Sequence, residues 1–345
     1  DPRPGSSPGT PGLFGGGVSS MEWRASGDAG MRSYDYSYDG LGRLVSADYG
    51  EGGVRRIGYG TSYSYDVMGN VLSLCREGDL SLSRKGIVDN LTMTYDGSRL
   101  LSVSDSALVP SVEGSGDFRD GAQMAVEYTY DGNGNMTSDL NRGISSVTYN
   151  RGNQPAVMIY QGGTESFTYL PDGTKLRREV SRTGVSPSTT EYRGNLVYED
   201  GVLKYVLFDG GLVSVGGDHT PDYVFFLKDH LGSTRVAARS DGSVAQVNHY
   251  YPYGMGYASS AMASRAELHP IGESLGGSVG GDLEIGELVE IPLSQSAQPY
   301  RFSGNELYAD NGLGLYDFRA RVYDPALGRF TSVDPLAEKY PRINP

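Results

Sequence analysis

The sequence predicts an all-β protein, a curling sheet built from repeated β-hairpins. Three observations lead to this fold class. Tyrosine is unusually common, with 26 residues against one tryptophan, and its ring and hydroxyl suit half-buried strands. The 50 glycines indicate many turns. A short phrase that begins with Tyr-Asp also recurs along the chain, which is typical of a repeat architecture.

The recurring phrase is Tyr-Asp, two or three residues that include Gly, then Arg or Asn and an apolar residue. Four copies begin at Tyr38-Asp39, Tyr65-Asp66, Tyr95-Asp96 and Tyr130-Asp131. Looser copies begin at Tyr149 and Tyr169. Their spacing of roughly 20 to 35 residues lies in the range of known repeat proteins.

Each copy predicts one β-hairpin. Alternating residues before the turn, as in "VEYTYD" at residues 126–131, predict a strand with period two. Asp-Gly and Gly-Asn pairs supply the positive φ and the side-chain hydrogen bonds of a tight turn. An alternating run after the turn predicts the return strand. Because one hairpin alone is marginal, successive hairpins should pair edge to edge into a long curling sheet.

The composition divides the chain into four segments. Residues 1–33 are rich in Pro, Gly and Ser and predict a linker or an irregular lead-in. Residues 34–254 carry the repeats and then more aromatic strands separated by glycine turns. Residues 255–298 are glycine-rich, acidic and almost free of aromatics, which predicts an inserted mobile loop. Regular sequence resumes over residues 299–345.

Charge and cysteine content exclude several classes of protein. The net charge of −13 disfavours nucleic acid as a partner, because phosphate would be repelled. Cys75 is the single cysteine, so no internal disulfide can form. No apolar run reaches the ~18 residues that a membrane-spanning helix needs. The chain starts at Asp1 without a signal peptide, and we expect both ends to be cut, so the sequence does not fix the compartment.

No metal or cofactor site is expected. Asp131–Asn135 resembles the first half of a calcium loop, but Arg142 stands where that loop needs a bidentate Glu. A hairpin turn is the simpler interpretation. The four histidines lie far apart and lack the spacing of metal ligands.

A Ser/His/Asp triad is suggested by Asp229-His230 with Ser233 nearby, and we reject it. Neighbouring residues on one strand point to opposite faces, so Asp229 could not orient His230. Gly232-Ser233 instead predicts a turn between two strands.

Three signatures, in the expected order, resemble a rearrangement-hotspot (RHS) or YD-repeat protein of bacterial type. The Tyr-Asp phrases match its repeats. The segment "FLKDHLGSTR" resembles a second block of the family, through Asp229, His230, Gly232 and Arg235. The segment "YDFRARVYDPALGRFTSVDP" resembles the RHS repeat-associated core, through Asp317, Arg321, Tyr323, Pro325, Gly328 and Arg329. The resemblance covers about residues 34–335, apart from the loop at 255–298.

The resemblance implies a fold, a role and partners. In this family the repeats spiral into a hollow cocoon, the core-associated segment plugs one end, and a C-terminal toxin or effector domain is held inside. The chain is then the C-terminal part of a shell, truncated before its cleavage point. Its partners would be the N-terminal remainder of the shell, the absent effector domain, and secretion machinery or a cell-surface ligand. The location would be secreted or on the cell surface, in toxin delivery or competition between bacteria.

Self-cleavage by aspartates in this family makes Asp334 the first catalytic candidate. An aspartyl peptidase needs two carboxylates that share one proton, and the resemblance places the partner beyond Pro345. Asp324 is a weaker partner candidate that a hairpin could bring close. Arg321 and Arg329 flank these acids, and a guanidinium would lower the pKa of a nearby carboxylate. The plainer interpretation is two Asp-Pro turns with ordinary ion pairs.

Three hypotheses about function remain open. The first is structural: a shell fragment that encloses an effector and has no catalysis of its own in this form. The second is an aspartyl self-processing module, active only in the full-length protein, although Leu336-Ala337 follows Asp334-Pro335 where the family has any residue and then Gly. The third is adhesion to a glycan or protein through the rows of tyrosines or the loop. A cross-strand aromatic ladder explains the same tyrosines.

Overall fold

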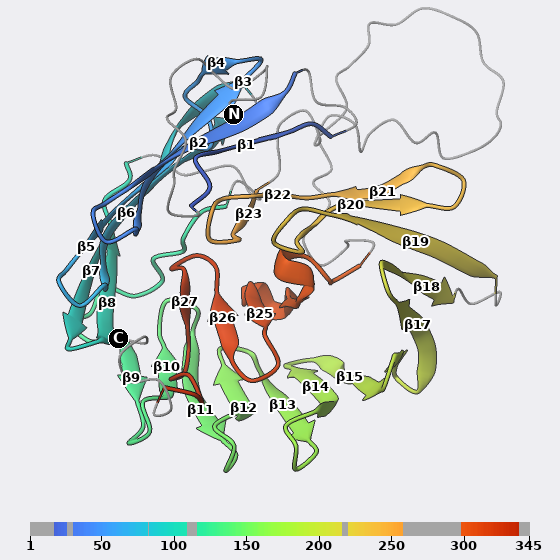
Figure 1. Ribbon diagram of the computed structural model, residues 1–345. Helices are drawn as coiled ribbons and strands as arrows, with labels where there is room; N and C mark the ends of the chain where they lie inside the picture. Colours follow the sequence, from blue (N-terminus) through green and yellow to red (C-terminus); the bar gives the residue numbers. More distant parts are fainter. Residues whose placement is uncertain are drawn as a thin grey trace, which may run out of the picture.

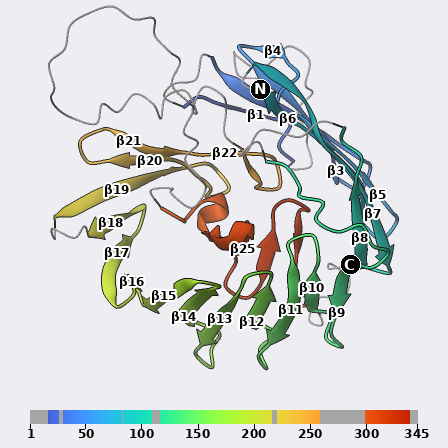
Figure 2. The ribbon, with the colours of Figure 1, turned by 180° about the vertical axis from the view of Figure 1, so that it is seen from behind.

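The structure, a computed structural model, describes residues 17–25, 30–81, 83–108, 116–215, 220–257 and 298–337. β-strands dominate these residues, so the predicted all-β class is confirmed. Two large antiparallel sheets curl around a small central sheet, as two opposite views show (Figures 1 and 2). The described residues include no helical segment with the length and hydropathy needed to cross a bilayer.

Sheet A is the eight-stranded sheet and contains the first three copies of the repeat phrase. Its strands are β1 (Ser20–Trp23), β2 (Arg32–Tyr38), β3 (Leu44–Glu51), β4 (Val54–Arg55), β5 (Thr61–Tyr65), β6 (Val71–Ser81), β7 (Arg84–Asp96) and β8 (Arg99–Asp105). They pair in chain order, except that β4 is a side branch and β3 continues to β5. Each phrase therefore forms the turn of an antiparallel hairpin, as predicted.

Sheet B has 13 strands that pair strictly in chain order. Its first half is β9 (Tyr128–Tyr130), β10 (Met136–Asp139), β11 (Ile144–Tyr149), β12 (Pro155–Tyr160), β13 (Gly163–Tyr169), β14 (Lys175–Arg182) and β15 (Val185–Arg193). Its second half is β16 (Leu196–Glu199), β17 (Val202–Phe208), β18 (Gly211–Val215), β19 (Pro221–Lys228), β20 (Thr234–Arg239) and β21 (Val244–Val247). Sheets A and B together are called the wall.

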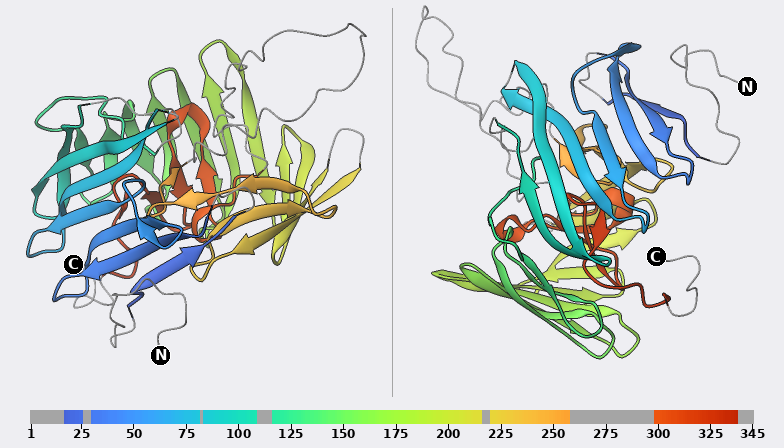
Figure 3. Two further views of the ribbon diagram at one scale, coloured as in Figure 1. Left: turned by 90° about the horizontal axis from the view of Figure 1, so that it is seen from above. Right: turned by 90° about the vertical axis from the view of Figure 1, so that its left-hand side faces the viewer.

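Residues 298–337 are called the plug, because they lie within the curl of the wall (Figures 1 and 3). Their elements are the 3-10 turns η3 (Phe302–Gly304) and η4 (Asp310–Gly312) and the strands β24 (Glu306–Tyr308), β25 (Leu315–Asp317), β26 (Val322–Asp324) and β27 (Arg329–Phe330). The four strands pair in chain order. A separate two-stranded ladder, β22 (His249–Tyr250) with β23 (Gly256–Tyr257), precedes the plug.

The aspartate of each full-length phrase holds its own turn. In the first copy, Asp39 Oδ1 accepts hydrogen bonds from the amides of Leu41 and Arg43, both at 2.9 Å. Gly42 has a φ of 79°, which explains the glycine of the phrase. The same pair of amide bonds recurs at three later turns, on Asp66, Asp131 and Asn150. The side chain thus satisfies turn amides that have no strand partner.

In three phrases the tyrosine reaches back to the preceding repeat. Its hydroxyl donates to the carbonyl that lies six residues after the preceding tyrosine. Three such bonds join Tyr65 to Leu44 at 2.6 Å, Tyr95 to Val71 at 2.9 Å and Tyr149 to Met136 at 2.7 Å. In the first copy, the Tyr38 hydroxyl donates to the Val18 carbonyl at 2.9 Å. These hydroxyls are therefore occupied within the wall and join neighbouring hairpins through backbone carbonyls. The described ring contacts do not join one phrase tyrosine to another, so the aromatic ladder stays a prediction.

The residue after the positive-φ position of the turn reaches forward to the next turn, and this contact is called the forward clamp. It joins Arg43 to the Asp66 carbonyl at 2.7 Å, Asn70 to Gly97 at 2.9 Å, Asn135 to the Asn153 side chain at 3.0 Å and Gln154 to Gly173 at 2.8 Å. Long polar side chains are needed here because adjacent turns are not connected by ladder bonds. The phrase thus encodes one backward, one local and one forward contact.

The structure differs from the predicted segments at three places. The repeats form two sheets and not one, because β8 and β9 share only a short contact in the described residues, from the Glu127 amide to the Leu101 carbonyl at 2.7 Å. The predicted lead-in at residues 1–33 contains β1 and the start of β2. Most of the loop predicted at residues 255–298 lies outside the described residues, and its first residues form β23.

Removing one tyrosine hydroxyl should weaken the wall by a measurable amount. In Tyr149→Phe the ring stays while the Met136 carbonyl loses its donor, so we expect the free energy of unfolding to fall by about 1 kcal/mol. Tyr223→Phe is the control, because that side chain is 45% exposed and has no hydrogen bond among the described contacts. Urea unfolding measures both variants, and equal stability of the two would contradict the role assigned to the hydroxyl.

Candidate functional site: the plug and its charged contacts

Apolar side chains anchor the plug to the inner faces of both wall sheets. Leu315 of β25 belongs to one buried cluster with Ile144 of sheet B. Ala326 and Leu327, which follow Pro325 in the β26–β27 turn, belong to a second cluster. That cluster combines side chains of sheet A and sheet B. The plug therefore completes a core that spans both sheets.

Arg142 provides a buried ionic contact between wall and plug. It lies in the turn after β10, where its Nη1 is 2.8 Å from Asp139 Oδ2 and its Nη2 is 2.6 Å from Asp324 Oδ1 of the plug. Its Nε donates to the Leu313 carbonyl at 2.9 Å. Burial raises the pKa of Asp139 although Arg142 opposes the shift, and the charge of Asp324 adds to it. One cation therefore holds two buried acids, one from each partner.

Lys175, at the start of β14, makes a similar contact. Its Nζ lies 2.7 Å from Glu306 Oε2, 2.6 Å from Asp317 Oδ2 and 2.9 Å from the Tyr308 hydroxyl. Burial alone would raise the pKa of Asp317, but Lys175 and the Tyr308 hydroxyl hold it below its usual value. Because these three partners lie on β24 and β25, one wall lysine fixes two plug strands.

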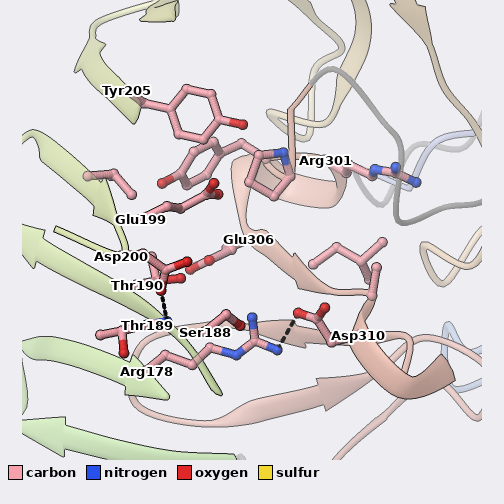
Figure 4. Close-up of a pocket in the computed structure, with 15 residues that line it drawn as sticks. Arg178, Ser188, Thr189, Thr190, Glu199, Asp200, Tyr205, Arg301, Glu306 and Asp310 are labelled. Atoms are coloured by element: carbon pink, nitrogen blue, oxygen red, sulfur yellow. Dashed lines mark hydrogen bonds and ion pairs between the residues drawn. The ribbon is translucent and has the colours of Figure 1, made fainter. Parts of the chain in front are cut away.

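Two arginines add contacts from different sheets. Arg178 Nη2 of β14 lies 2.9 Å from Glu165 Oε1 in the wall and 2.8 Å from Asp310 Oδ2 in the plug (Figure 4). Arg76 of sheet A donates through Nη1 to the Ala326 carbonyl at 2.6 Å. Arg182 of β14 also forms an ion pair with Asp310. The wall therefore binds the plug with five cations among the described contacts, and they come from both sheets.

The block at residues 229–235 is a turn of the same type as the repeat turns. Asp229 Oδ1 accepts the amides two and four residues later, at 3.0 and 2.9 Å, and Gly232 has a φ of 79°. Arg235 Nε binds Asp229 Oδ2 at 2.8 Å. The turn begins at Asp229, because β19 ends at Lys228, so the argument from strand alternation against a triad does not apply. His230 is exposed at the tip, and Asp229 is occupied by the turn and Arg235.

This turn also contacts the first part of the plug. The Thr234 amide donates to the Arg301 carbonyl at 2.9 Å. The Ser303 amide of the plug donates to the Ser233 hydroxyl at 3.1 Å. The block that resembles a family signature therefore positions η3 and the entry to the plug.

The two Asp-Pro aspartates lie in different environments. Asp324 is 4% exposed and binds Arg142. Asp334 lies in a turn after β27, where it accepts the Leu336 amide at 2.8 Å and lies 2.8 Å from Arg321 Nη2. Within the described part of the chain, no hydrogen bond or ion pair joins the two carboxylates. The structure therefore gives each aspartate its own arginine and forms no shared-proton pair from these two residues.

The remaining residues of the core motif contact the wall and the nearby loop. The Tyr323 hydroxyl donates to the Tyr253 carbonyl at 2.9 Å. Gly328 has a φ of 68°, and a Cβ there would lie 3.0 Å from the Tyr253 ring. Arg329 donates to the Ser98 carbonyl of sheet A at 3.3 Å. Arg329 is therefore directed to the wall, whereas the guanidinium that does contact Asp334 belongs to Arg321.

A cavity of about 270 Å³ lies between sheet B and the first part of the plug (Figure 4). Glu199 and Tyr205 line it from the wall, and Glu306 and Asp310 line it from the plug. Glu306 and Asp310 are also the acids that bind Lys175 and Arg178. The cavity is thus the polar margin of the plug contact.

Three acids, two on sheet A and one in the segment that follows it, could in principle bind a metal ion. Carboxylate oxygens of Asp89, Asp105 and Asp117 lie within 4.8 Å of one another. Asp89 is already bound by Arg76 and by the Phe118 amide. These contacts explain the acids without an ion, and the absence of a metal site stays a prediction.

Comparison with known proteins shows the fold. No protein-family model matches the chain. The crystal structure of a TcdB2-TccC3-Cdc42 complex matches with a TM-score of 0.51 and 17% identity, covering 92% of this chain and 16% of that chain. A Tc holotoxin pore of Photorhabdus luminescens matches with a TM-score of 0.51 and 16% identity over the same shares, 92% and 16%. The chain thus has the fold of a section of these much longer toxin chains.

Curated proteins match at a similar level of identity. Double-stranded DNA deaminase toxin A of Burkholderia cenocepacia is 23% identical over 342 residues, which is 88% of this chain and 20% of the relative. Salivary gland surface protein 1 of Aedes aegypti is 24% identical over 239 residues, which is 63% of this chain and 6% of the relative. The chain therefore spans a fifth or less of the length of these relatives.

Sequence reasoning missed the wall cations that hold the plug. From the sequence alone, Arg142 is considered only as the residue that rules out a calcium loop, and no role is assigned to Lys175 or Arg178. A signal was present for Arg178, which shares its strand parity with Val180, and both are buried. Nothing in the spacing identifies the plug acids that these cations bind.

Loss of Arg142 should destabilise the fold strongly. In Arg142→Met, Asp139 and Asp324 stay buried without a counter-charge, so we expect the free energy of unfolding at neutral pH to fall by about 3–5 kcal/mol. Arg177→Met is the matched control, because its ion pair with Glu179 is largely exposed, and it should cost less than about 1 kcal/mol. Chemical unfolding measures the free energy of unfolding of both variants. Similar decreases in the two would show that the buried contact is not important for stability.

Proposed function

We propose that the chain is a wall section and plug of an RHS-type shell that encloses a C-terminal effector domain. The main support is the position of the plug. It lies on the inner faces of both sheets and is held by Arg142, Lys175, Arg178 and Arg76. A segment bound this firmly inside a curled wall is suited to close a compartment. Its residues are occupied in packing, which favours a structural role.

The comparisons support this proposal in general terms. A protein named as a toxin matches most of the chain, and the Tc toxin complexes share its fold. Since the chain spans only a small part of each, the effector and the remainder of the wall would be its partners in a longer protein. Secretion and toxin delivery, between bacteria or at a cell surface, belong to the same proposal.

Self-processing is the second candidate, and Asp334 favours it. This carboxylate is partly exposed, with 27% of its side-chain surface accessible, and it follows the last plug strand. Arg321 fixes its position at 2.8 Å. A second acid supplied by the longer protein would complete a pair that shares a proton. Adhesion stays a prediction without such an observation, because the repeat tyrosines use their hydroxyls within the wall.

Enclosure can be tested by protease protection of the downstream domain in the full-length protein. We expect the effector to be degraded at least about tenfold more slowly than the same domain expressed alone, because cleavage then requires opening of the shell. Arg142→Met, which loosens the plug, should remove much of this protection, and Arg177→Met should retain it. Equal degradation of enclosed and isolated effector would end the enclosure proposal.

Self-processing can be tested separately with Asp334→Asn in the full-length protein. The amide keeps the shape of the side chain and cannot act as a base, so we expect cleavage after the plug to stop while the protein stays folded. Asp172→Asn is the control, because Asp172 is a turn carboxylate far along the chain from the plug. Gel analysis of the chain measures cleavage. Normal cleavage of Asp334→Asn would exclude the role of this residue without affecting enclosure.

A further inference from the structure

The junction between β8 of sheet A and β9 of sheet B, called the seam, is the weak line of the wall. Inside each sheet, neighbouring hairpins share a ladder of backbone bonds. Among the described residues, a single backbone bond, from the Glu127 amide to the Leu101 carbonyl, joins the two sheets at the seam. The buried Glu127 carboxylate adds bonds to the Val103 amide at 2.9 Å and to the Asn141 side chain at 2.8 Å. These contacts lie at one end of the seam, away from the repeat turns.

The turn end of the seam also lacks a forward clamp from the wall. The third phrase, at residues 95–100, is shorter than the others, and Asp96 pairs directly with Arg99 across a two-residue turn. No described hydrogen bond or ion pair leads from Arg99 to the fourth turn. The third repeat therefore receives a clamp from Asn70 but passes none on.

The plug supplies contacts at this point, through three alternating residues. Arg329 donates to the Ser98 carbonyl in the third turn at 3.3 Å. Two residues later, the Thr331 carbonyl accepts the Met136 amide of β10 at 2.8 Å. Two residues further, Val333 packs closely against Gly134 of the fourth turn. A Cβ added at Gly134 would lie 2.8 Å from Val333 Cγ2. The segment from β27 onward thus lies along the seam and touches both sheets.

The charge of Arg329 acts on both sides of the seam. Its guanidinium carbon is 5.7 Å from the centre of the Tyr95 ring in sheet A. Burial raises the pKa of both Tyr95 and Tyr130, and Arg329 opposes the rise at each. These are the phrase tyrosines of the third and fourth repeats, so one guanidinium lies near both. Arg329 thus lies where a forward clamp would lie, but it comes from the plug and not from the third repeat.

We infer that residues 329–333 of the plug are a clasp that joins the two wall sheets, with Arg329 as the clamp that the third repeat lacks. The plug then does more than fill the interior, because its binding also joins sheet A to sheet B. When the β26–β27 hairpin leaves, the seam keeps the Glu127 contacts and the apolar packing of Leu100 and Val103 against Tyr128 and Met136, but it loses its contacts at the turn end and becomes the line along which the wall opens. Arg329 is a positioning residue in this account and takes no part in cleavage.

Hydrogen exchange in the full chain tests the clasp. In Arg329→Met we expect amides in peptides 99–105 and 127–139 to exchange about tenfold faster, the factor for loss of one charge-assisted hydrogen bond. Peptides 163–182, which lie in sheet B away from the seam, should not change. Arg151→Met is the matched control, because Arg151 is an exposed turn arginine without a described contact, and it should leave all these peptides unchanged.

Two outcomes would overturn the inference: unchanged exchange at the seam, or an equal rise across the whole chain. If Arg329→Met does not fold, Arg329→Lys gives the same test on a smaller scale, since lysine keeps the charge but loses the planar donor group. A rise confined to the seam peptides supports the clasp in either variant.

Discussion

The fold depends on charge complementarity between the inner face of the wall and the plug. Burying an unpaired charge costs several kcal/mol, so Arg142, Lys175 and Arg178 could not lie on that face without partners. The wall supplies only part of the compensation, through Asp139 and Glu165. The rest comes from acids of the plug, at 2.6 to 2.8 Å. Without the other, the wall would keep buried cations and the plug would keep acids that lack ionic partners. This explains why a segment so late in the chain lies inside the wall.

The repeat phrase explains how the wall keeps its order before any plug contact is considered. Tyrosines tie several turns to the repeat before them, and Arg, Asn or Gln ties each full-length turn to the repeat after it. A solenoid with such nearest-neighbour contacts is stable only as a continuous series, so one defective copy matters. The short third phrase is that copy, and the wall divides into two sheets directly after it. The division coincides with the shorter turn of this copy and with the stretch between β8 and β9, where the described residues form no strand.

The sequence predicted what local chemistry determines and missed what distant contacts determine. Hairpins, turns and the half-buried positions of the phrase tyrosines follow from alternation and from Asp and Gly in the phrase. The strand β1 was missed because Ser20–Trp23 lies among Gly and Pro, and its place depends on Trp23, whose ring is 5.2 Å from that of Tyr34. The charged site was missed because strand parity shows that Arg178 faces inward without showing what it meets. Its partner Asp310 lies on the far side of the loop.

The two Asp-Pro steps show why similar motifs can have different roles. An acid that must exchange protons with substrate and water has to be reached by both. Asp324 is buried, and removing its charge would leave Arg142 with one acid fewer, so its environment suits permanent ionisation and fixed geometry. Asp334 is more accessible, and Arg321 that binds it also lies 3.7 Å from the centre of the Phe330 ring. That ring belongs to β27, so the strand that runs along the seam also sets the position of Asp334. Movement of β27 away from the wall would therefore also displace the turn that contains Asp334.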